Sequence, residues 1–142
     1  MENPAYLSEQ ELIELHDRII GLIGGKSGIR DHAALESCVA QPKTTVFGVE
    51  RFPTVFDKAA AYCFFIVSAH PFMDGNKRAG LVAALTFLLH HGVAPAFTED
   101  EMYSTILQVA RGELSVDDLS SVFRRTSNVR DPGGEDIPRT QS

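Results

Sequence analysis

The chain has 142 residues, which is the size of one domain and enough to bury a hydrophobic core. It is 44% hydrophobic and 23% charged, as ordinary globular proteins are, and its net charge of −6 argues against general nucleic-acid binding. The most apolar region, residues 59–69, is too short to cross a membrane, and the first ten residues lack the basic and apolar stretches of a signal peptide.

Capping residues followed by apolar residues at helical spacing predict six helices. Ser8 with Glu11, and Thr98 with Glu101, form capping boxes. The other predicted caps are Asp31, Thr54 and Ser115. In chain order, the predicted elements are helices at 9–22 and 32–41, a loop or short hairpin at 43–53, helices at 55–70 and 76–91, an extended piece at 93–97, and helices at 99–111 and 116–125.

The helices at 55–70 and 76–91 are apolar on nearly every side, so we expect both to be buried in the centre of the fold. From Ser127 onward the chain has few apolar residues, which predicts a disordered tail. The prediction is therefore an all-α, mainly helical bundle over residues 1–126, with two central buried helices, followed by a tail at 127–142.

The two central helices are joined by the stretch HPFMDGNKRAG, residues 70–80. The first amides of a helix lack intrahelical acceptors and carry about half an elementary charge, so the helix start at Asn76 is an anion site. Gly75 lets the backbone approach a ligand closely. Lys77 and Arg78 place two cations in the first turn, where acids are the usual residues. This pattern favours a bound anion.

The neighbouring residue types suit phosphate chemistry. Asp74 offers hard oxygen ligands for a magnesium ion that also contacts phosphates, and Asn76 can donate to a phosphate oxygen. His70 can take a proton from a hydroxyl nucleophile. Phe72 is expected to insert into the core, and Pro71 to stiffen the entry to the loop. By spacing alone a plain interhelical turn explains the loop equally well, because these are ordinary turn residues.

The nine residues from His70 to Arg78 resemble the signature of the Fic/Doc family, in which a helix, an HPFxDGN loop and a second helix form the active site. Residues 27–42, SGIRDHAALESCVAQP, resemble the segment that precedes the flap in Doc-like members. The resemblance covers residues 5–125, and it implies a Fic/Doc-like helical fold with a short β-like flap.

The resemblance also implies a role for each motif residue. His70 would be the general base and Asp74 would bind magnesium, while the Gly75 amide and the Asn76 side chain would hold phosphates. The segment at 43–56 matches the family's flap in position, and the extended edge of such a flap can bind a target peptide by adding a strand.

Two positions depart from the larger Fic branch, which has a glycine and a second arginine where this chain has Lys77 and Leu81. A lysine fills the space in which the α-phosphate lies during AMP transfer, and the Doc branch has the same lysine. The resemblance thus implies a toxin kinase that uses ATP and Mg²⁺, with Lys77 and Arg78 neutralising phosphate charge. Its implied target is a threonine of elongation factor Tu, whose phosphorylation blocks translation. The alternatives are protein adenylyl transfer and a non-catalytic helical module that binds a nucleotide or a partner.

Many family members carry an inhibitory helix with the pattern [ST]xxxE[GN]. Glutamate followed by glycine or asparagine occurs here only at Glu2, too close to the start for the rest of the pattern. The resemblance therefore implies a separate antitoxin protein, whose inhibitory groups could meet Arg78.

Three further signals are interpreted as structural. Residues 21–28, GLIGGKSG, lack the first glycine of a P-loop and follow a helix instead of a strand. His16 and His32 have no partner at metal-ligand spacing and are expected on the surface. Cys38 and Cys63 do not form a disulfide framework, which indicates a protein of the reducing cytoplasm.

Overall fold

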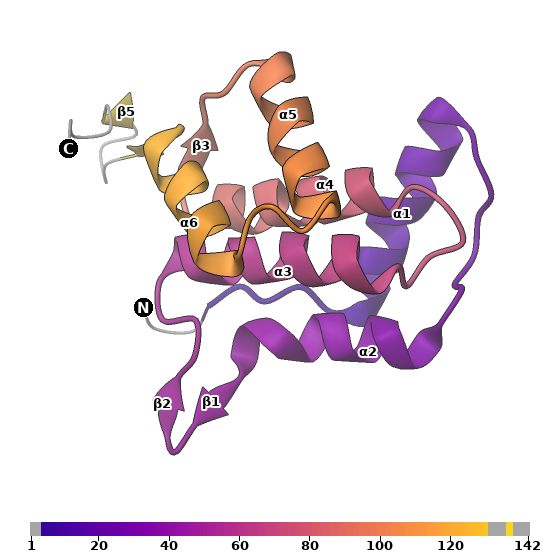
Figure 1. The fold of residues 1–142 in the computed structure, drawn as a ribbon, viewed down its shortest axis with the longest axis horizontal. Helices are drawn as coiled ribbons and strands as arrows, with labels where there is room; N and C mark the ends of the chain where they lie inside the picture. The colour runs from indigo at the N-terminus through magenta and orange to yellow at the C-terminus, as the bar shows by residue number, and fades with distance from the viewer. Residues whose placement is uncertain (1–3, 131–135, 138–142) are drawn as a thin grey trace.

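Six α-helices and two small antiparallel sheets make up the computed structural model, which describes residues 4–130 and 136–137 (Figure 1). The elements are α1 (Glu9–Ile23), α2 (His32–Ala40), a 3₁₀ turn (Gln41–Lys43), β1 (Thr45–Val46), β2 (Val49–Glu50), α3 (Val55–Ala69), α4 (Asn76–His90), β3 (Val93–Pro95), α5 (Glu99–Ala110), α6 (Val116–Arg125), β4 (Ser127–Arg130) and β5 (Asp136–Ile137). The predicted mainly helical class and the six predicted helices are confirmed. Within the described ranges, no helix combines the length and the apolar character that a membrane span requires.

Five of the six described helices begin directly after a residue that was predicted as a cap. In each case a side-chain oxygen accepts a first-turn N–H, at Ser8, Asp31, Thr54, Thr98 and Ser115. Thr54 also forms a capping box with Asp57, which was not predicted. The second carboxylate oxygen of Asp57 accepts the Ser120 hydroxyl at 2.6 Å and so joins α3 to α6.

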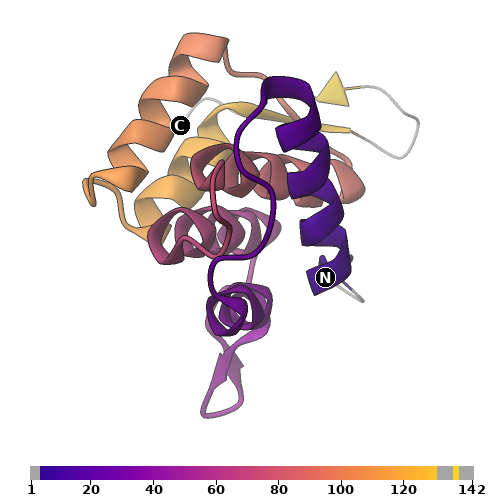
Figure 2. The same ribbon diagram turned by 90° about the vertical axis from the view of Figure 1, so that its right-hand side faces the viewer.

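α3 and α4 lie side by side through the middle of the molecule, with α2 and α6 packed on α3 and α1 packed on α4 (Figures 1 and 2). A Cβ atom at Gly80 would lie 2.8 Å from Val67 Cγ2 and 3.0 Å from the Cys63 carbonyl oxygen, so the two helices approach closely there. Neither helix is buried on every side, because Phe64 is half-buried and Leu89 is 57% exposed.

Strands β1 and β2 form a hairpin that projects from the helices, at the lower left of Figure 1. Its two turn residues, Phe47 (φ 50°) and Gly48 (φ 78°), both have positive φ, as in a type I′ turn. The Phe47 side chain is fully exposed, and its neighbours Val46 and Val49 are exposed too. The predicted loop or short hairpin is therefore a hairpin with an apolar tip.

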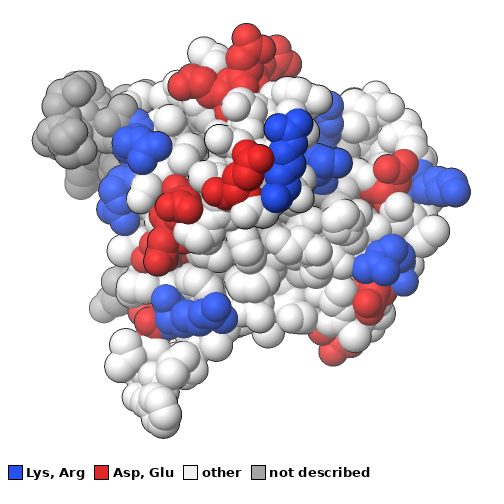
Figure 3. All heavy atoms as spheres, in the orientation of Figure 1, with Lys and Arg blue, Asp and Glu red and all other residues white. Residues whose placement is uncertain are grey.

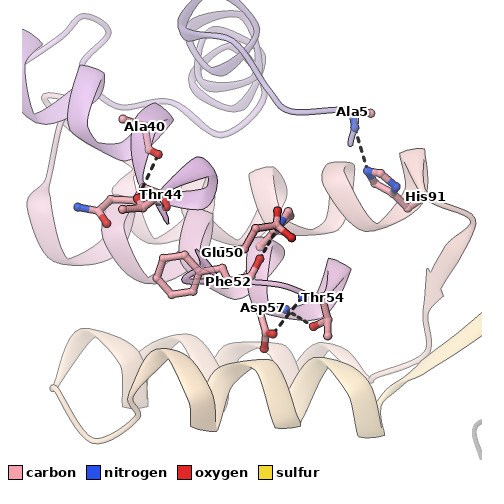
Figure 4. A network of polar contacts seen from close by, with 10 residues as sticks. Ala5, Ala40, Thr44, Glu50, Phe52, Thr54, Asp57 and His91 are labelled. Atoms are coloured by element: carbon pink, nitrogen blue, oxygen red, sulfur yellow. Dashed lines mark hydrogen bonds and ion pairs between the residues drawn. The ribbon is translucent and has the colours of Figure 1, made fainter. Parts of the chain in front are cut away.

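A buried lysine attaches the base of this hairpin to α3. Lys58 is 1% exposed, and its ammonium donates to the Glu50 carboxylate at 2.9 Å and to the Phe52 carbonyl (Figure 4). Burial of a charged group requires such partners. The ion pair thus fixes the end of β2, the hairpin's return strand, against the helical core.

The second sheet has the order β3-β4-β5, with Val93 opposite Val129 and Pro95 opposite Ser127. The predicted disordered tail is therefore wrong for residues 127–130 and 136–137, because residues 127–129 pair with β3 and residues 129–130 pair with β5. Residues 131–135 and 138–142 lie outside the described residues, and the division of the chain at residue 126 stays a prediction.

Candidate active site

The loop between α3 and α4 is framed by two residues in the left-handed conformation: His70 ends α3 with φ 51°, and Gly75 begins α4 with φ 74°. Between them Pro71 and Phe72 are buried, and the Phe72 ring lies in the core as expected. The Asn76 side chain closes the loop, since its Oδ1 accepts the Phe72 N–H and its Nδ2 donates to the Phe72 carbonyl, both at 3.0 Å. Asn76 therefore shapes the loop, and its contact with phosphate stays a prediction.

The first turn of α4 presents backbone N–H groups together with two cations. Asn76, Lys77 and Arg78 are its first three residues, and such amides have no intrahelical acceptor. The N-cap is Gly75, and no side chain among the described residues caps this end of the helix. Lys77 and Arg78 are exposed, so their charges add to that of the helix start. An anion is the ligand that this arrangement favours.

A cavity of about 620 Å³ lies beside this helix start, between α4 and α5, a volume typical of small-molecule sites. Its lining consists of Ile23, Asp74, Gly75, Asn76, Lys77, Arg78, Leu81, Glu99, Asp100, Met102, Tyr103, Ile106 and Leu107. The loop and the start of α4 therefore supply the basic side of the cavity, and α5 supplies most of its apolar side. Acidic residues gather where α5 begins, at the top of Figure 3.

His70 lies at the other end of the loop, exposed, and is not among the residues that line the cavity. The guanidinium of Arg30 holds the backbone there: Nε donates to the His70 carbonyl at 2.5 Å and Nη2 donates to the Ala69 carbonyl at 2.8 Å. The last carbonyls of a helix have no intrahelical donor, so Arg30 satisfies the end of α3. This contact fixes the backbone from which an accessible imidazole extends.

The connection between α1 and α2 runs alongside the loop (Figure 2). Main-chain contacts join the two segments: Met73 N–H to Gly28 O at 3.0 Å, Arg30 and Asp31 N–H to Pro71 O at 2.7 and 3.1 Å, and a β-bridge between Ile29 and Phe72. At Gly25 (φ 115°) a Cβ atom would lie 2.8 Å from Asp74 Oδ2. The glycine-rich stretch that resembled a P-loop thus braces the loop, a role that the sequence analysis missed and that its clustered glycines could have indicated.

The Asp74 carboxylate is exposed, and two backbone N–H groups fix its orientation. Its Oδ1 accepts the Gly75 N–H at 3.0 Å and its Oδ2 accepts the Lys26 N–H at 3.2 Å. Each carboxylate oxygen keeps a further lone pair, so these bonds leave Asp74 able to coordinate a cation. Magnesium is commonly bound by one or two carboxylates plus substrate phosphates, and this donor fits that pattern.

The prediction that His16 lies on the surface is wrong. Its side chain is 1% exposed, its ring is stacked on that of Phe72, and its Nε2 is 2.7 Å from the Asp74 carbonyl oxygen. The sequence held a signal for this, because Leu12, His16 and Ile19 follow at helical spacing and are the buried face of α1. His32 is exposed as predicted, between the carboxylates of Glu9 and Glu36.

Comparison with known proteins supplies independent information on this site. The family model described as the Fic/DOC family matches residues 6–88, which include the loop and the first turn of α4. The chain is 37% identical over 100 residues to "Toxin Doc" of Mycolicibacterium smegmatis, covering 69% of this chain and 77% of that protein. It is 33% identical over 120 residues to "Protein kinase doc" of Escherichia phage P1, covering 84% of this chain and 94% of that protein.

Proposed function

Since the chain belongs to the Fic/DOC family, we propose that it is a Doc-type toxin, a protein kinase that transfers the γ-phosphate of ATP to a protein hydroxyl. The names of the two relatives support the toxin and kinase parts of this proposal. The observation that carries it is the start of α4, where free amides and the cations of Lys77 and Arg78 line a cavity of small-molecule size. Phosphoryl transfer depends mainly on such positioning and charge neutralisation.

In the proposed reaction the terminal phosphate of ATP lies at the first turn of α4. His70 takes the proton of the acceptor hydroxyl, whose oxygen forms the new bond to the γ-phosphorus as the bond to the β–γ bridging oxygen breaks and ADP leaves. The exposure of His70 supports this role, because the hydroxyl belongs to another protein. Asp74 would hold Mg²⁺, which supplies charge neutralisation on the phosphate oxygens when bound.

The family resemblance suggests the partners. We propose a threonine of elongation factor Tu as acceptor, with blocked translation as the result, and a separate antitoxin as inhibitor. The hairpin β1–β2 would serve as the flap, because its exposed apolar tip and short strands are suited to a peptide.

We also propose that the protein acts in the cytoplasm. Cys38 and Cys63 are both free and buried, and burial raises the pKa of each thiol to about 12. Such protonated thiols are packing residues that need no oxidising compartment.

The test is incubation of the protein and elongation factor Tu with ATP labelled at either the α- or the γ-phosphate. We expect label on the target from γ-labelled ATP alone. His70→Ala should abolish the transfer, while His32→Ala, a change at an exposed histidine of α2, should leave it unchanged. Label from the α-phosphate would establish adenylyl transfer instead, and bound ATP without any transfer would establish a non-catalytic module.

A further inference from the structure

The buried side chain of His16 lies beneath the active-site loop. Its ring centroid is 4.0 Å from that of Phe72, with an interplanar angle of 4°, and its Nε2 is 2.7 Å from the Asp74 carbonyl oxygen. His16 is 1% exposed and does not line the cavity, so it does not reach a substrate there. Its ring stacking on Phe72 and its Nε2 contact with the Asp74 carbonyl are both made with the loop itself.

We propose that His16 is a positioning residue for nucleotide binding, whose Nε2–H holds the Asp74 carbonyl and thereby orients the Asp74–Gly75 peptide at the start of α4. This inference rests on the proposed function, in which that helix start binds ATP. A carbonyl oxygen only accepts hydrogen bonds, so Nε2 must carry a hydrogen. The other ring nitrogen, Nδ1, lies 4.0 Å from an Asp17 carboxylate oxygen. Nε2 donates whether or not Nδ1 is also protonated.

Because the peptide bond is planar, the contact of His16 with the Asp74 carbonyl also sets the direction of the Gly75 N–H. In a planar trans peptide the carbonyl and the following N–H point in opposite directions. With the Asp74 carbonyl held toward α1, the Gly75 N–H points away from α1, and it donates to Asp74 Oδ1 at 3.0 Å. His16 therefore orients the carboxylate of Asp74, the proposed magnesium ligand, through the peptide between Asp74 and Gly75.

An outside partner is needed because Gly75 leaves the peptide free to rotate. Glycine occupies positive and negative φ almost equally well, so its own φ of 74° does not fix the orientation. A rotated peptide would turn the Asp74 carbonyl toward its own carboxylate, and the bond from the Gly75 N–H would be lost. Without the His16 donor we expect the loop to sample such orientations.

Two substitutions test the N–H donor and the aromatic ring of His16 separately. His16→Phe keeps an aromatic ring to stack on Phe72 but removes the N–H, and His16→Gln removes the ring but retains an N–H donor of similar reach. His32→Phe is the matched control, because His32 is exposed on α2 and its ring nitrogens lie 3.0 Å from carboxylate oxygens of Glu9 and Glu36, which lie outside the loop.

Calorimetry measures the Kd for MgATP. NMR of the free protein shows which imidazole nitrogens are protonated. We expect Nε2 of His16 to be protonated. The Kd should rise about tenfold in His16→Phe, stay within about threefold of wild type in His16→Gln, and not change in His32→Phe. Thermal unfolding of each variant establishes that it is folded, and if His16→Phe does not fold, His16→Gln and the NMR spectrum decide.

Any one of three results would overturn the proposal. These are an NMR spectrum in which Nε2 carries no hydrogen, a folded His16→Phe variant that binds MgATP as tightly as wild type, and a folded His16→Gln variant that binds MgATP about tenfold more weakly than wild type. Failure of the proposed function is distinguishable from these. If wild type does not bind MgATP, the kinase proposal is wrong, while the spectrum of the free protein still shows whether Nε2 donates.

Discussion

Arg30 connects the segment between α1 and α2 to the end of α3 and the active-site loop, and its hydrogen bonds there all go to main-chain carbonyls. Its guanidinium donates to the carbonyls of Ala69 and His70, and its own N–H donates to the carbonyl of Pro71. The end of α3, from which the proposed base extends, is therefore held by a residue 40 positions earlier in the chain.

We predict that Arg30→Ala lowers the rate of phosphoryl transfer about tenfold, because displacement of a catalytic group by a fraction of an ångström is costly. The KM for ATP should change little, since Arg30 does not line the cavity. Arg30→Lys should recover part of the rate, and Arg111→Ala, at the exposed end of α5, serves as control. Steady-state kinetics check this. An unchanged rate for Arg30→Ala would show that the contacts of Arg30 with the end of α3 have no role in positioning His70.

The part of the site that could be predicted is the part that is contiguous in sequence. The residues from His70 to Arg78 follow one another, so their types and the helix start at Asn76 were visible together. His16 and Lys26 lie 58 and 48 positions from their partner Asp74, and no local pattern connects positions so far apart. Their roles depend on how the segment between α1 and α2 returns to the loop.

The packing of α3 against α4 depends on one glycine in the helix interior. A Cβ atom at Gly80 would come within 2.8 Å of Val67 Cγ2, and backbone atoms of Cys63 leave little room to adjust. We predict that Gly80→Ala lowers the free energy of unfolding by about 1–3 kcal/mol through overpacking.

The matched control for this change is Gly21→Ala. Gly21 lies in α1, and a Cβ atom there would have no atom within 4 Å. The better helix propensity of alanine should therefore raise the free energy of unfolding by up to about 1 kcal/mol. Urea denaturation of both variants checks the pair, and equal effects of the two changes would contradict the close approach of α3 and α4.

The hairpin β1–β2 exposes an aromatic side chain that packs against no residue of the described structure. Phe47 is fully exposed at the tip, so Phe47→Ser should change the free energy of unfolding by less than about 0.5 kcal/mol. If the hairpin is the flap, the same change should raise the KM for the protein target several-fold while leaving the Kd for MgATP unchanged. A wild-type KM for the target would mean that the tip does not contact it.

The N-terminal segment is attached to the far end of α4 by a histidine that must be neutral. The Ala5 N–H donates to Nε2 of His91 at 3.1 Å, which requires an unprotonated Nε2 (Figure 4). Burial, with smaller contributions from the charges of His90 and Lys58, holds the pKa of His91 below its usual value. The unfolded chain therefore binds this proton more readily than the folded one.

The resulting stability is present above the usual histidine pKa of about 6.5 and is lost as the pH falls through the lower pKa of the folded state. We predict that the free energy of unfolding decreases less between pH 7 and pH 5 in His91→Gln than in wild type. His90→Gln, a change at the exposed neighbour, should retain most of the decrease. Urea titrations at both pH values check this, and identical slopes for wild type and His91→Gln would contradict it.

The order of the helices was predictable because five of the six described helices carry a capping side chain in the adjacent sequence, and the sixth, α4, follows the glycine of the loop. Strand β4 was not predictable, because its residues 127–129 pair with residues 93–95, more than 30 positions away. The sequence around it is also polar enough to resemble a tail. Strand pairing of this kind is a tertiary contact that composition does not reveal.

In the proposed mechanism, the start of α4 and His70 together transfer a terminal phosphate to a protein hydroxyl. The decisive test of this mechanism is mass spectrometry of elongation factor Tu after incubation with this protein and MgATP. We expect the mass gain of one phosphoryl group on a threonine, and we expect no such gain when the His70→Ala variant replaces the wild type. The mass gain of an adenylyl group, or the same phosphoryl gain with His70→Ala, would contradict this mechanism.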